Sequence, residues 1–313
     1  MTQFTGKIEQ ALLQRLHQVR KLVGLTPLYK INNVYSKPGV SIYAKLEWYQ
    51  LGGSVKSRPA FNIINQAIRS GALNRKKRLL DATSGNTGIA YAAIGAALGI
   101  PVTLCLPENA SAERKQILRA LGVELIYTSR FDLTDGAQLK AKALYAENPL
   151  LYYYADQYAN ENNWLAHYNG TALEIWEQTT GTVTHFIAGL GTTGTFTGTG
   201  RRLKELNPAV QLIGLQPDGP MHSLEGWKHL ETAFVPPIYD PQLADQIREV
   251  DSYEALDLVK AVAQKEGLLI SPSAAANLLG AIQLAGQIDE GVIVTTFADN
   301  AEKYSEVLQH LFQ

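Results

Sequence analysis

Short apolar runs alternate with helical segments through most of this chain, and glycine or proline stands near most boundaries. The runs predicted as strands are Leu79–Ala82, Pro101–Leu106, Val123–Tyr127, Val183–Ala188, Val210–Leu215, Leu268–Ser271 and Val292–Phe297. The predicted helices are Pro59–Ala67, Ile89–Leu98, Ala112–Leu121 and Thr195–Leu206. Strands joined through helices by short loops pair in parallel and carry helices on both faces. The two series of strands therefore predict an α/β protein with two domains, each with a central, mostly parallel sheet flanked by helices.

Composition excludes several classes of protein. The formal net charge of −1 argues against a nucleic-acid binder, which would normally show a basic face. Cys105 is the single cysteine, so the chain can form no internal disulfide and no cysteine-rich metal site. Cys105 lies in the apolar run Val102–Leu106, where a buried and unreactive thiol is expected. A single cysteine also fits a reducing compartment, and we expect a cytoplasmic protein that binds neither metal nor nucleic acid.

Two segments could be taken for membrane or targeting signals. Residues 89–106 carry no charge, but Gly99 and Pro101 interrupt them, so a helix, a turn and a buried strand are expected. Near the N-terminus, apolar residues recur at helical spacing: Ile8, Leu12, Leu13, Leu16 and Val19. Because Glu9 is present and serine is absent there, we expect a packed or surface helix and no transit peptide.

The turn Gly189–Gly194 follows a predicted strand and opens a predicted helix. It reads G-x-G-x-x-G, which is the pattern of a dinucleotide site, and Asp218 follows near the expected spacing. The physical content of such a turn is broader, because glycines let backbone N–H groups approach any phosphate at a helix N-terminus. The turn alone therefore predicts phosphate binding and leaves a dehydrogenase possible.

Two further features suggest a different cofactor. Lys56 stands between the pair Gly52-Gly53 and a predicted helix, and Thr83–Gly88 is a second turn at a helix N-terminus that suits an anion. A pyridoxal-phosphate enzyme requires a cradle for the cofactor phosphate, a second cradle for the substrate carboxylate, and an amine that holds the cofactor. The chain contains all three parts.

Several motifs now occur together in one order. They are Gly24-Leu25-Thr26-Pro27-Leu28, Lys45-Leu46-Glu47, Gly53-Ser54-Val55-Lys56, Thr83–Gly88, Gln157-Tyr158-Ala159-Asn160, Gly191–Thr195 and His222–Gly226. In these motifs the chain resembles the cysteine synthase (O-acetylserine sulfhydrylase) family of fold-type II pyridoxal-phosphate enzymes, which share the fold of the tryptophan synthase β subunit. The resemblance covers all but the first twenty or so residues, and it replaces the dehydrogenase interpretation.

The resemblance implies a role for each matching residue. Lys56 binds pyridoxal 5′-phosphate covalently and, once the substrate has displaced it, removes the α-proton. Asn86 bonds the ring oxygen of the cofactor, and Ser273 faces the pyridine nitrogen, with Ser271 as a near competitor. The substrate-carboxylate residues are Thr83, Ser84, Gly85, Thr87 and Gln157. The phosphate residues are Gly191, Thr192, Thr193, Gly194 and Thr195.

The implied reaction is β-replacement on an O-activated L-serine, with sulfide or another thiol as nucleophile and L-cysteine as product. A neutral hydroxyl at the pyridine nitrogen leaves the ring a weak electron sink, which favours elimination of a β-leaving group. Homocysteine or an amine remains an alternative nucleophile, because Gln157–Trp164 also resembles amine-using relatives. The chain departs from the family pattern at Gln50-Leu51 and Ser57. A non-catalytic binding protein is therefore a second alternative.

The leaving group and the domain bounds follow from the same resemblance. In relatives that accept O-phosphoserine, a cation precedes a Phe-Val-Pro segment, and here Lys228 precedes Phe234-Val235-Pro236. We expect a smaller domain at residues 43–148, which holds Lys56, and a larger one at 1–42 and 149–313, which holds the phosphate turn. We also expect a homodimer that has small-molecule partners and no membrane contact.

Overall fold

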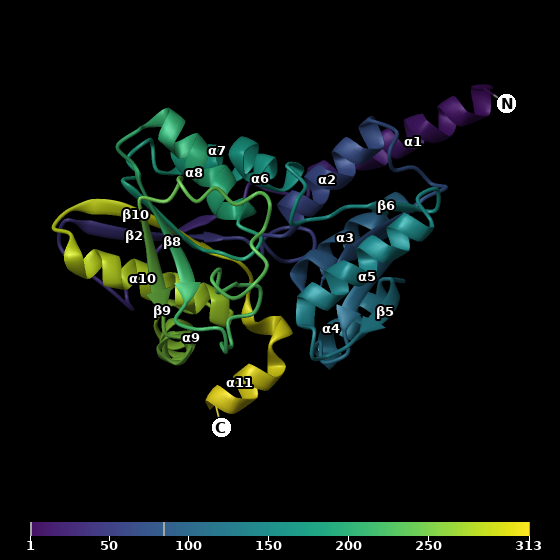
Figure 1. Cartoon of the computed structure of the whole chain (residues 1–313). Coiled ribbons are helices and arrows are strands. Elements are labelled where there is room, and N and C mark those ends of the chain that lie inside the picture. The colour runs from purple at the N-terminus through teal and green to yellow at the C-terminus, as the bar shows by residue number, and fades with distance from the viewer. Residues whose placement is uncertain (1, 84, 313) are drawn as a thin grey trace. The chain divides into compact units, whose positions relative to one another are not determined.

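The computed structural model describes residues 2–83 and 85–312, and its contacts divide the chain into two compact units (Figure 1). The first unit covers the described parts of Met1–Gly24, Gln50–Gly52 and Lys56–Asn162. The second covers those of Leu25–Tyr49, Gly53–Val55 and Asn163–Gln313. The N-terminal helix thus groups with the first unit, whereas the sequence placed residues 1–42 with the larger domain. The division into domains at residues 43 and 148 stays a prediction.

The first unit is built on a four-stranded parallel sheet with the strand order β5-β4-β3-β6. Its strands are β3 (Arg78–Ala82), β4 (Val102–Pro107), β5 (Glu124–Thr128) and β6 (Tyr152–Tyr154). Its helices are α1 (Thr2–Arg20), α2 (Ser57–Arg69), α3 (Asn86–Leu98), α4 (Ala112–Ala120) and α5 (Leu133–Glu147). Successive side chains of β3 point to opposite faces of the sheet, because side chains alternate along a strand. Leu79 packs with residues of α1 to α4, whereas Leu80 packs with α5.

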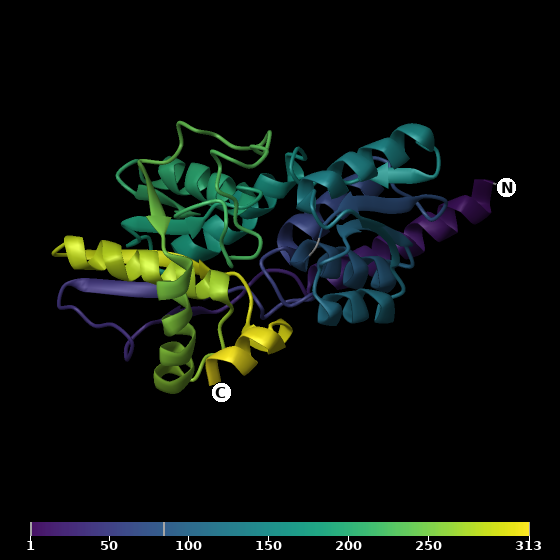
Figure 2. The same cartoon turned by 60° about the horizontal axis from the view of Figure 1, so that its bottom comes forward.

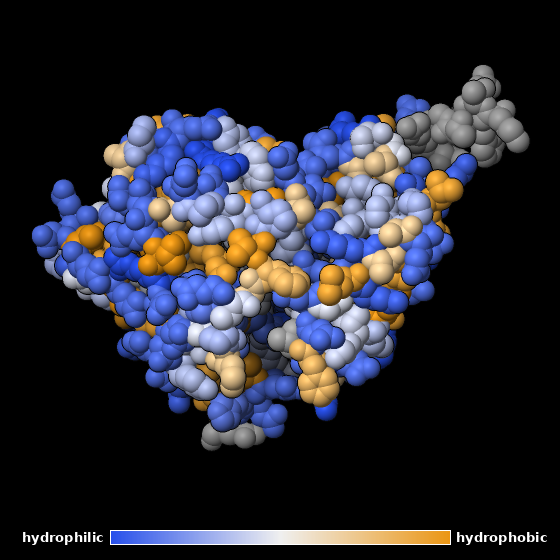
Figure 3. All heavy atoms as spheres, in the orientation of Figure 1, coloured by the Kyte–Doolittle hydropathy of each residue, from blue (hydrophilic) through white to orange (hydrophobic). Residues whose placement is uncertain are grey.

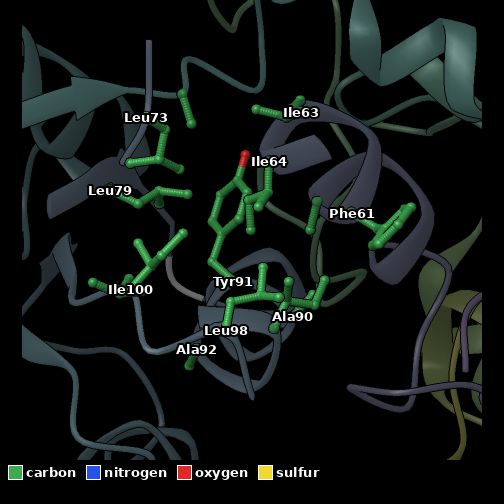
Figure 4. Packing of buried hydrophobic residues seen from close by; sticks show 14 of the residues in the cluster. Phe61, Ile63, Ile64, Leu73, Leu79, Ala90, Tyr91, Ala92, Leu98 and Ile100 are labelled. Carbon is green, nitrogen blue, oxygen red and sulfur yellow. The ribbon is translucent and has the colours of Figure 1, made fainter. Parts of the chain in front are cut away.

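The larger hydrophobic cluster of this unit surrounds Tyr91 of α3. Figure 4 shows the Tyr91 ring among Ile64 of α2, Leu73 and Leu79. Glycines let α3 approach the sheet closely, since a Cβ atom at Gly95 would lie 2.6 Å from Cγ2 of Val102. Helix α3 is therefore packed firmly against β3 and β4, and its first turn has a defined place at the edge of the sheet.

The second unit is built on a six-stranded sheet with the order β1-β2-β10-β7-β8-β9. Its strands are β1 (Leu28–Lys30), β2 (Val40–Leu46), β7 (His185–Gly189), β8 (Gln211–Pro217), β9 (Gln246–Val250) and β10 (Gly291–Phe297). The pair β1–β2 is antiparallel and the other pairs are parallel. One face packs against α9 (Ser252–Glu266) and α10 (Pro272–Gln287), and the other packs against α7 (Ala172–Gln178) and α8 (Gly194–Leu206). Figure 2 shows α10 running alongside the strands of this sheet.

The remaining elements of the second unit are short. A one-turn helix α6 (Asn162–Ala166), which begins in the first unit, continues as a π-helical turn η1 (His167–Thr171) into α7. Near the C-terminus, a 3₁₀ turn η2 (Ala301–Lys303) precedes α11 (Ser305–Phe312). The π-helical turn packs against α8, so its side chains can reach the turn that precedes that helix.

The structure confirms the α/β class and most predicted elements. Predicted strands recur with ends shifted by one or two residues, and the helix predicted at Ile89–Leu98 begins at Asn86. The strand predicted at Leu268–Ser271 is wrong, because only Ile270 forms an isolated bridge there, to Asn300. The reason is that Ser271 caps α10: its Oγ accepts a hydrogen bond from the Ala274 N–H at 3.2 Å. This apolar run leads into a helix.

The N-terminal segment and Cys105 lie as predicted. Leu12, Leu16 and Val19 of α1 are buried in the hydrophobic cluster of the first unit. Cys105 is fully buried in β4, and this burial raises the pKa of its thiol to about 11.

The face drawn in Figure 3 is mainly hydrophilic, with small hydrophobic patches. Among the described residues, no helix is both long and apolar enough to cross a membrane.

Candidate active site

The turn after β3 and the turn after β6 meet at one edge of the first sheet. The two strands pair in parallel, with Leu80 opposite Tyr154, and the Ala155 N–H extends the pairing by donating to the Leu80 carbonyl at 2.9 Å. Carboxyl ends of adjacent parallel strands lie at the same edge, which is where ligands bind in open α/β sheets. Residues after Ala82 and after Ala155 are therefore neighbours.

Three of the predicted carboxylate-binding residues come together in this way. The Thr87 hydroxyl donates to Oε1 of Gln157 at 2.7 Å, and Nε2 of Gln157 donates to the Ala82 carbonyl at 2.9 Å. Thr83 Oγ1 accepts from the Gly85 N–H at 3.2 Å, and all three side chains are buried. Ser84 lies outside the described residues. Asn86, which was predicted to bond the ring oxygen of the cofactor, is the first residue of α3.

A buried carboxylate that the sequence did not single out lies beneath this turn. Asp81 is fully buried, and it accepts hydrogen bonds from the Ala82 N–H at 2.8 Å and the Gln157 N–H at 3.3 Å. Burial raises the pKa of Asp81 to about 7, while the bond from Ala82 opposes that rise. An aspartate at the end of an apolar strand carries no local signal of such a role, because its partner Gln157 is distant along the chain.

Lys56 occupies the position immediately before α2. The preceding residues are fixed in the second unit: the Val55 N–H donates to the Ala298 carbonyl at 2.8 Å, and Nζ of Lys303 donates to the Gly53 carbonyl at 3.0 Å. Gly52 and Gly53 have φ of 88° and 63°, which only glycine adopts readily. The glycine pair thus turns the chain so that Lys56, which is half-buried, begins the first turn of α2.

The glycines of the turn between β7 and α8 lie against backbone and buried side chains. A Cβ at Gly191 would lie 1.9 Å from the Gly226 carbonyl oxygen, and one at Gly194 would lie 2.0 Å from Oδ1 of Asn163. Thr193 has φ of 68°, a strained conformation for a β-branched residue. Its buried hydroxyl has no hydrogen-bond partner among the described residues. The turn therefore leaves a hydroxyl donor available at the N-terminus of a 13-residue helix.

Two residues behind this turn were not predicted from the sequence. Nδ2 of Asn163 donates to Oγ1 of Thr192 at 3.1 Å. His167 lies in the π-helical turn, with Nε2 at 3.3 Å from Oγ1 of Thr195 and Nδ1 at 2.9 Å from Oγ1 of Thr171. Both side chains are buried. Asn163 of α6 thus holds the side chain of Thr192, and His167, which the packing of η1 on α8 brings to the turn, holds that of Thr195.

This turn fits the phosphate of a pyridoxal cofactor. The glycines bring the backbone close, the helix N-terminus supplies partial positive charge, and the Thr193 hydroxyl is a buried donor. These features suit a phosphate dianion. When bound, the cofactor would supply an electron-withdrawing ring.

Ser271 and Ser273 differ in how their hydroxyls are used. Ser271 Oγ caps α10 by accepting from the Ala274 N–H, and it lies 3.1 Å from Ser273 Oγ. Ser273 is buried but makes no capping bond of this kind. The capping role of Ser271 favours Ser273 as the hydroxyl available to a ligand.

Lys228 lies close to the phosphate turn through its backbone. Its N–H donates to the Leu190 carbonyl at 2.8 Å, one residue before Gly191, and its side chain is partly exposed. The adjacent Trp227 explains the glycine at 189, because a Cβ there would lie 2.0 Å from the indole Cε2. The segment Trp227-Lys228 thus packs onto the end of β7 and the start of the phosphate turn.

Comparison with known proteins defines the class. A family model described as "Pyridoxal-phosphate dependent enzyme" matches residues 19–299, so the chain belongs to this family and is a pyridoxal-phosphate-dependent enzyme. The matched range contains Lys56, both turns and Ser273.

Individual relatives place it more narrowly within the family. The chain is 44% identical to the cysteine synthase of Aquifex aeolicus, over 96% of this chain and 94% of that protein. It is 37% identical to the O-acetylserine dependent cystathionine beta-synthase of Bacillus subtilis, over 91% of this chain and 95% of that protein. Its structure matches that of the cysteine synthase of Entamoeba histolytica with a TM-score of 0.86 and 31% identity, over 94% of each chain. These matches confirm the cysteine synthase family and the fold-type II class.

Proposed function

We propose that this enzyme catalyses β-replacement on O-acetylserine with sulfide or another thiol donor and produces L-cysteine. In the net reaction the Cβ–O bond breaks, acetate leaves with the bonding electron pair, and a Cβ–S bond forms. The observation that carries the proposal is the buried contact of Thr87 with Gln157 at the edge of the first sheet. This contact supports a site for an amino-acid carboxylate in a chain whose relatives include cysteine synthases.

The residues divide the work by position. Thr83, Gly85, Thr87 and Gln157 bind the substrate carboxylate, and Asn86 bonds the ring oxygen of the cofactor. Gly191, Thr192, Thr193, Gly194 and Thr195 bind its phosphate. Ser273 donates to or accepts from the pyridine nitrogen as a neutral group. The cofactor, when bound, withdraws electrons from the substrate α-carbon.

Lys56 carries the proton transfer. Its amine would hold the cofactor covalently, and the same amine, when free, would take the α-proton of the substrate. Helix α2, which follows Lys56, packs against α3, which begins at Asn86 and Thr87. The loop before Lys56 also lies close to α3, because a Cβ at Gly52 would lie 3.1 Å from the Ala90 Cα.

The direct test is Lys56→Ala. The variant is expected to lose at least about a thousandfold in turnover, because both the covalent bond and the general base disappear. Absorption at long visible wavelengths, which marks the covalently bound cofactor, should disappear as well. The exposed Lys265→Ala variant is the matched control and should keep both signals. Full turnover in Lys56→Ala would disprove the mechanism.

A second nucleophile is supported by one comparison. The Bacillus subtilis relative is named for O-acetylserine and cystathionine, and it is about as long as this chain. Homocysteine is therefore the main alternative to sulfide, and an amine is the next. Rates with O-acetylserine and each of the three nucleophiles at equal concentration decide between them, and sulfide is expected to give the highest kcat/KM.

We also propose that the enzyme is a cytoplasmic homodimer. The family resemblance and the presence of a single, buried cysteine support this. Sedimentation equilibrium should give twice the chain mass of 34.3 kDa.

A further inference from the structure

Asp81 connects the ends of two neighbouring strands through their backbones. It is the penultimate residue of β3, and its two oxygens accept from the Ala82 N–H at 2.8 Å and from the Gln157 N–H at 3.3 Å. Both donors belong to peptides from which the candidate carboxylate site is built. Bonds from N–H groups to an ionised carboxylate are stronger than neutral ones, and burial shields them from water.

The Gln157 peptide follows a residue with an unusual backbone conformation. Asp156 has φ of 44°, in the left-handed region that side chains with a Cβ rarely occupy. The bond from the Gln157 N–H to Asp81 holds the peptide that follows this residue. The Gln157 side chain then reaches the Ala82 carbonyl at 2.9 Å and the Thr87 hydroxyl at 2.7 Å. The orientation of the Gln157 side-chain amide thus depends on a backbone that Asp81 holds through the Gln157 N–H.

Tyrosine, cysteine and acidic side chains surround Asp81, and the Tyr91 hydroxyl also stabilises its ionised form. Tyr91 of α3, Tyr154 of β6, Cys105 of β4 and Asp156 all interact with the Asp81 charge. Each is neutral or negative, and burial raises the pKa of Asp81 to about 7. A fully buried carboxylate in such a place is costly, and its two N–H bonds offset part of that cost.

We propose that Asp81 is a positioning residue for the α-carboxylate of the substrate. It holds the Ala82 and Gln157 peptides so that Gln157 and Thr87 present their polar groups to that carboxylate. This inference rests on the proposed function, which assigns an amino-acid substrate to the turn at Thr83–Gly88. Its specific consequence is that loss of Asp81 weakens ligands that have an α-carboxylate and spares matched ligands that lack one.

The experiment compares two ligands in the holoenzyme of wild type and Asp81→Asn. L-Methionine has no β-leaving group, and 3-(methylthio)propylamine is the same molecule without the carboxylate. Asparagine has the shape of aspartate but places an NH₂ donor where one N–H needs an acceptor. Calorimetry at about pH 8, above the Asp81 pKa of about 7, should show methionine binding weakened by about tenfold or more, the effect of one lost bond to a charged acceptor. The amine should change by less than about twofold, since it does not use the site.

A second readout does not involve substrate. Exchange of the Gln157 backbone amide with solvent deuterium should be about tenfold faster in Asp81→Asn, because its acceptor is lost. The Asp81→Glu variant keeps a carboxylate and is expected to retain the preference for methionine within about threefold of wild type. If the asparagine variant does not fold, Asp81→Glu is the variant in which the preference for methionine and the exchange at Gln157 are measured.

The matched control is Cys105→Ala. Cys105 lies opposite Ala82 in the adjacent strand and is equally buried, so its truncation loosens the same part of the sheet without removing a bond to Gln157. This control should lower thermal stability and leave the methionine preference unchanged.

The outcomes separate the two hypotheses. Equal weakening of both ligands in Asp81→Asn, or unchanged exchange at Gln157, overturns the positioning role. A wild-type enzyme that binds methionine no better than the amine would instead contradict the carboxylate site of the proposed function, and the positioning role with it. If wild type prefers methionine to the amine and Asp81→Asn loses this preference, the result supports both the proposed function and the positioning role.

Discussion

At Asp81, burial and hydrogen bonding act in opposite directions. Burial favours the neutral carboxylic acid, whereas the N–H groups of Ala82 and Gln157 favour the ionised carboxylate. Burial raises its pKa from 3.8 to about 7, so between these pH values the folded protein holds a proton that the unfolded chain has released. The free energy of unfolding contributed by this group therefore falls as pH rises, by about 1.4 kcal/mol per pH unit within the window.

We predict that Asp81→Asn abolishes this dependence. From pH 5 to pH 8, the stability of wild type relative to the variant should fall by roughly 2–3 kcal/mol. Urea unfolding of both proteins across that range measures it, with Cys105→Ala as a control that keeps the wild-type slope. A relative stability that stays constant across the range would show that Asp81 is ionised throughout.

The side chain of Lys228 provides the prediction about the leaving group. A phosphate carries nearly two negative charges, and a lysine that meets it acts as a point charge, without the paired geometry of arginine. We predict that O-phosphoserine is accepted beside O-acetylserine, and that Lys228→Ala lowers kcat/KM for O-phosphoserine about tenfold more than for O-acetylserine.

The control for Lys228 is Lys265→Ala, which removes an exposed cation of α9. It should change both efficiencies equally. If Lys228→Ala also affects the two substrates equally, or affects neither, Lys228 does not distinguish the leaving group.

At the scale of elements, the phosphate turn depends on how closely β7 and α8 approach their neighbours. Gly191→Ala would place a methyl group 1.9 Å from the Gly226 carbonyl oxygen, so one of the two segments must move. We predict a loss of about 1–3 kcal/mol in stability and at least about tenfold weaker cofactor binding, because the backbone N–H groups shift away from the phosphate.

Gly286 offers a matched substitution within a helix. A Cβ there meets nothing within 4 Å, so Gly286→Ala in α10 should raise stability by about 0.5–1 kcal/mol and leave cofactor affinity unchanged. Titration of the apoprotein with pyridoxal 5′-phosphate and thermal unfolding measure both effects. Unaltered cofactor affinity in Gly191→Ala would contradict the assignment of the phosphate to this turn.

For the whole molecule, the residues proposed to hold the cofactor come from segments far apart in the chain, from Lys56 to Ser273. A ligand present at ~100 times its dissociation constant adds roughly 2.7 kcal/mol to stability. Holoenzyme should therefore melt several degrees above apoenzyme, and thermal unfolding of the two forms measures the difference. Identical melting of apoenzyme and holoenzyme would contradict binding of the cofactor by these residues.

Much of this molecule could be predicted because the signals are local. Alternating apolar runs and glycine boundaries predicted most strands and helices, and the Ser111 cap of α4 and the Gly99 end of α3 are present as the residue types indicate. The position of Lys56 before a helix and the turn before α8 also follow from neighbouring residues. Backbone preferences and capping bonds act over a few residues, so the sequence reveals them directly.

Only the tertiary structure decided which distant segments meet. The parallel pairing of β6 with β3 brings Gln157 to Thr87 and to Asp81, and the packing of η1 on α8 brings His167 to Thr195. The apolar run at Leu268–Ser271, expected as a strand, became the entry to a helix. Strand pairing and helix packing depend on surface complementarity between residues far apart in the chain, and no local pattern records it. The sequence by itself determined the elements and the chemical groups; the fold determined which groups became neighbours.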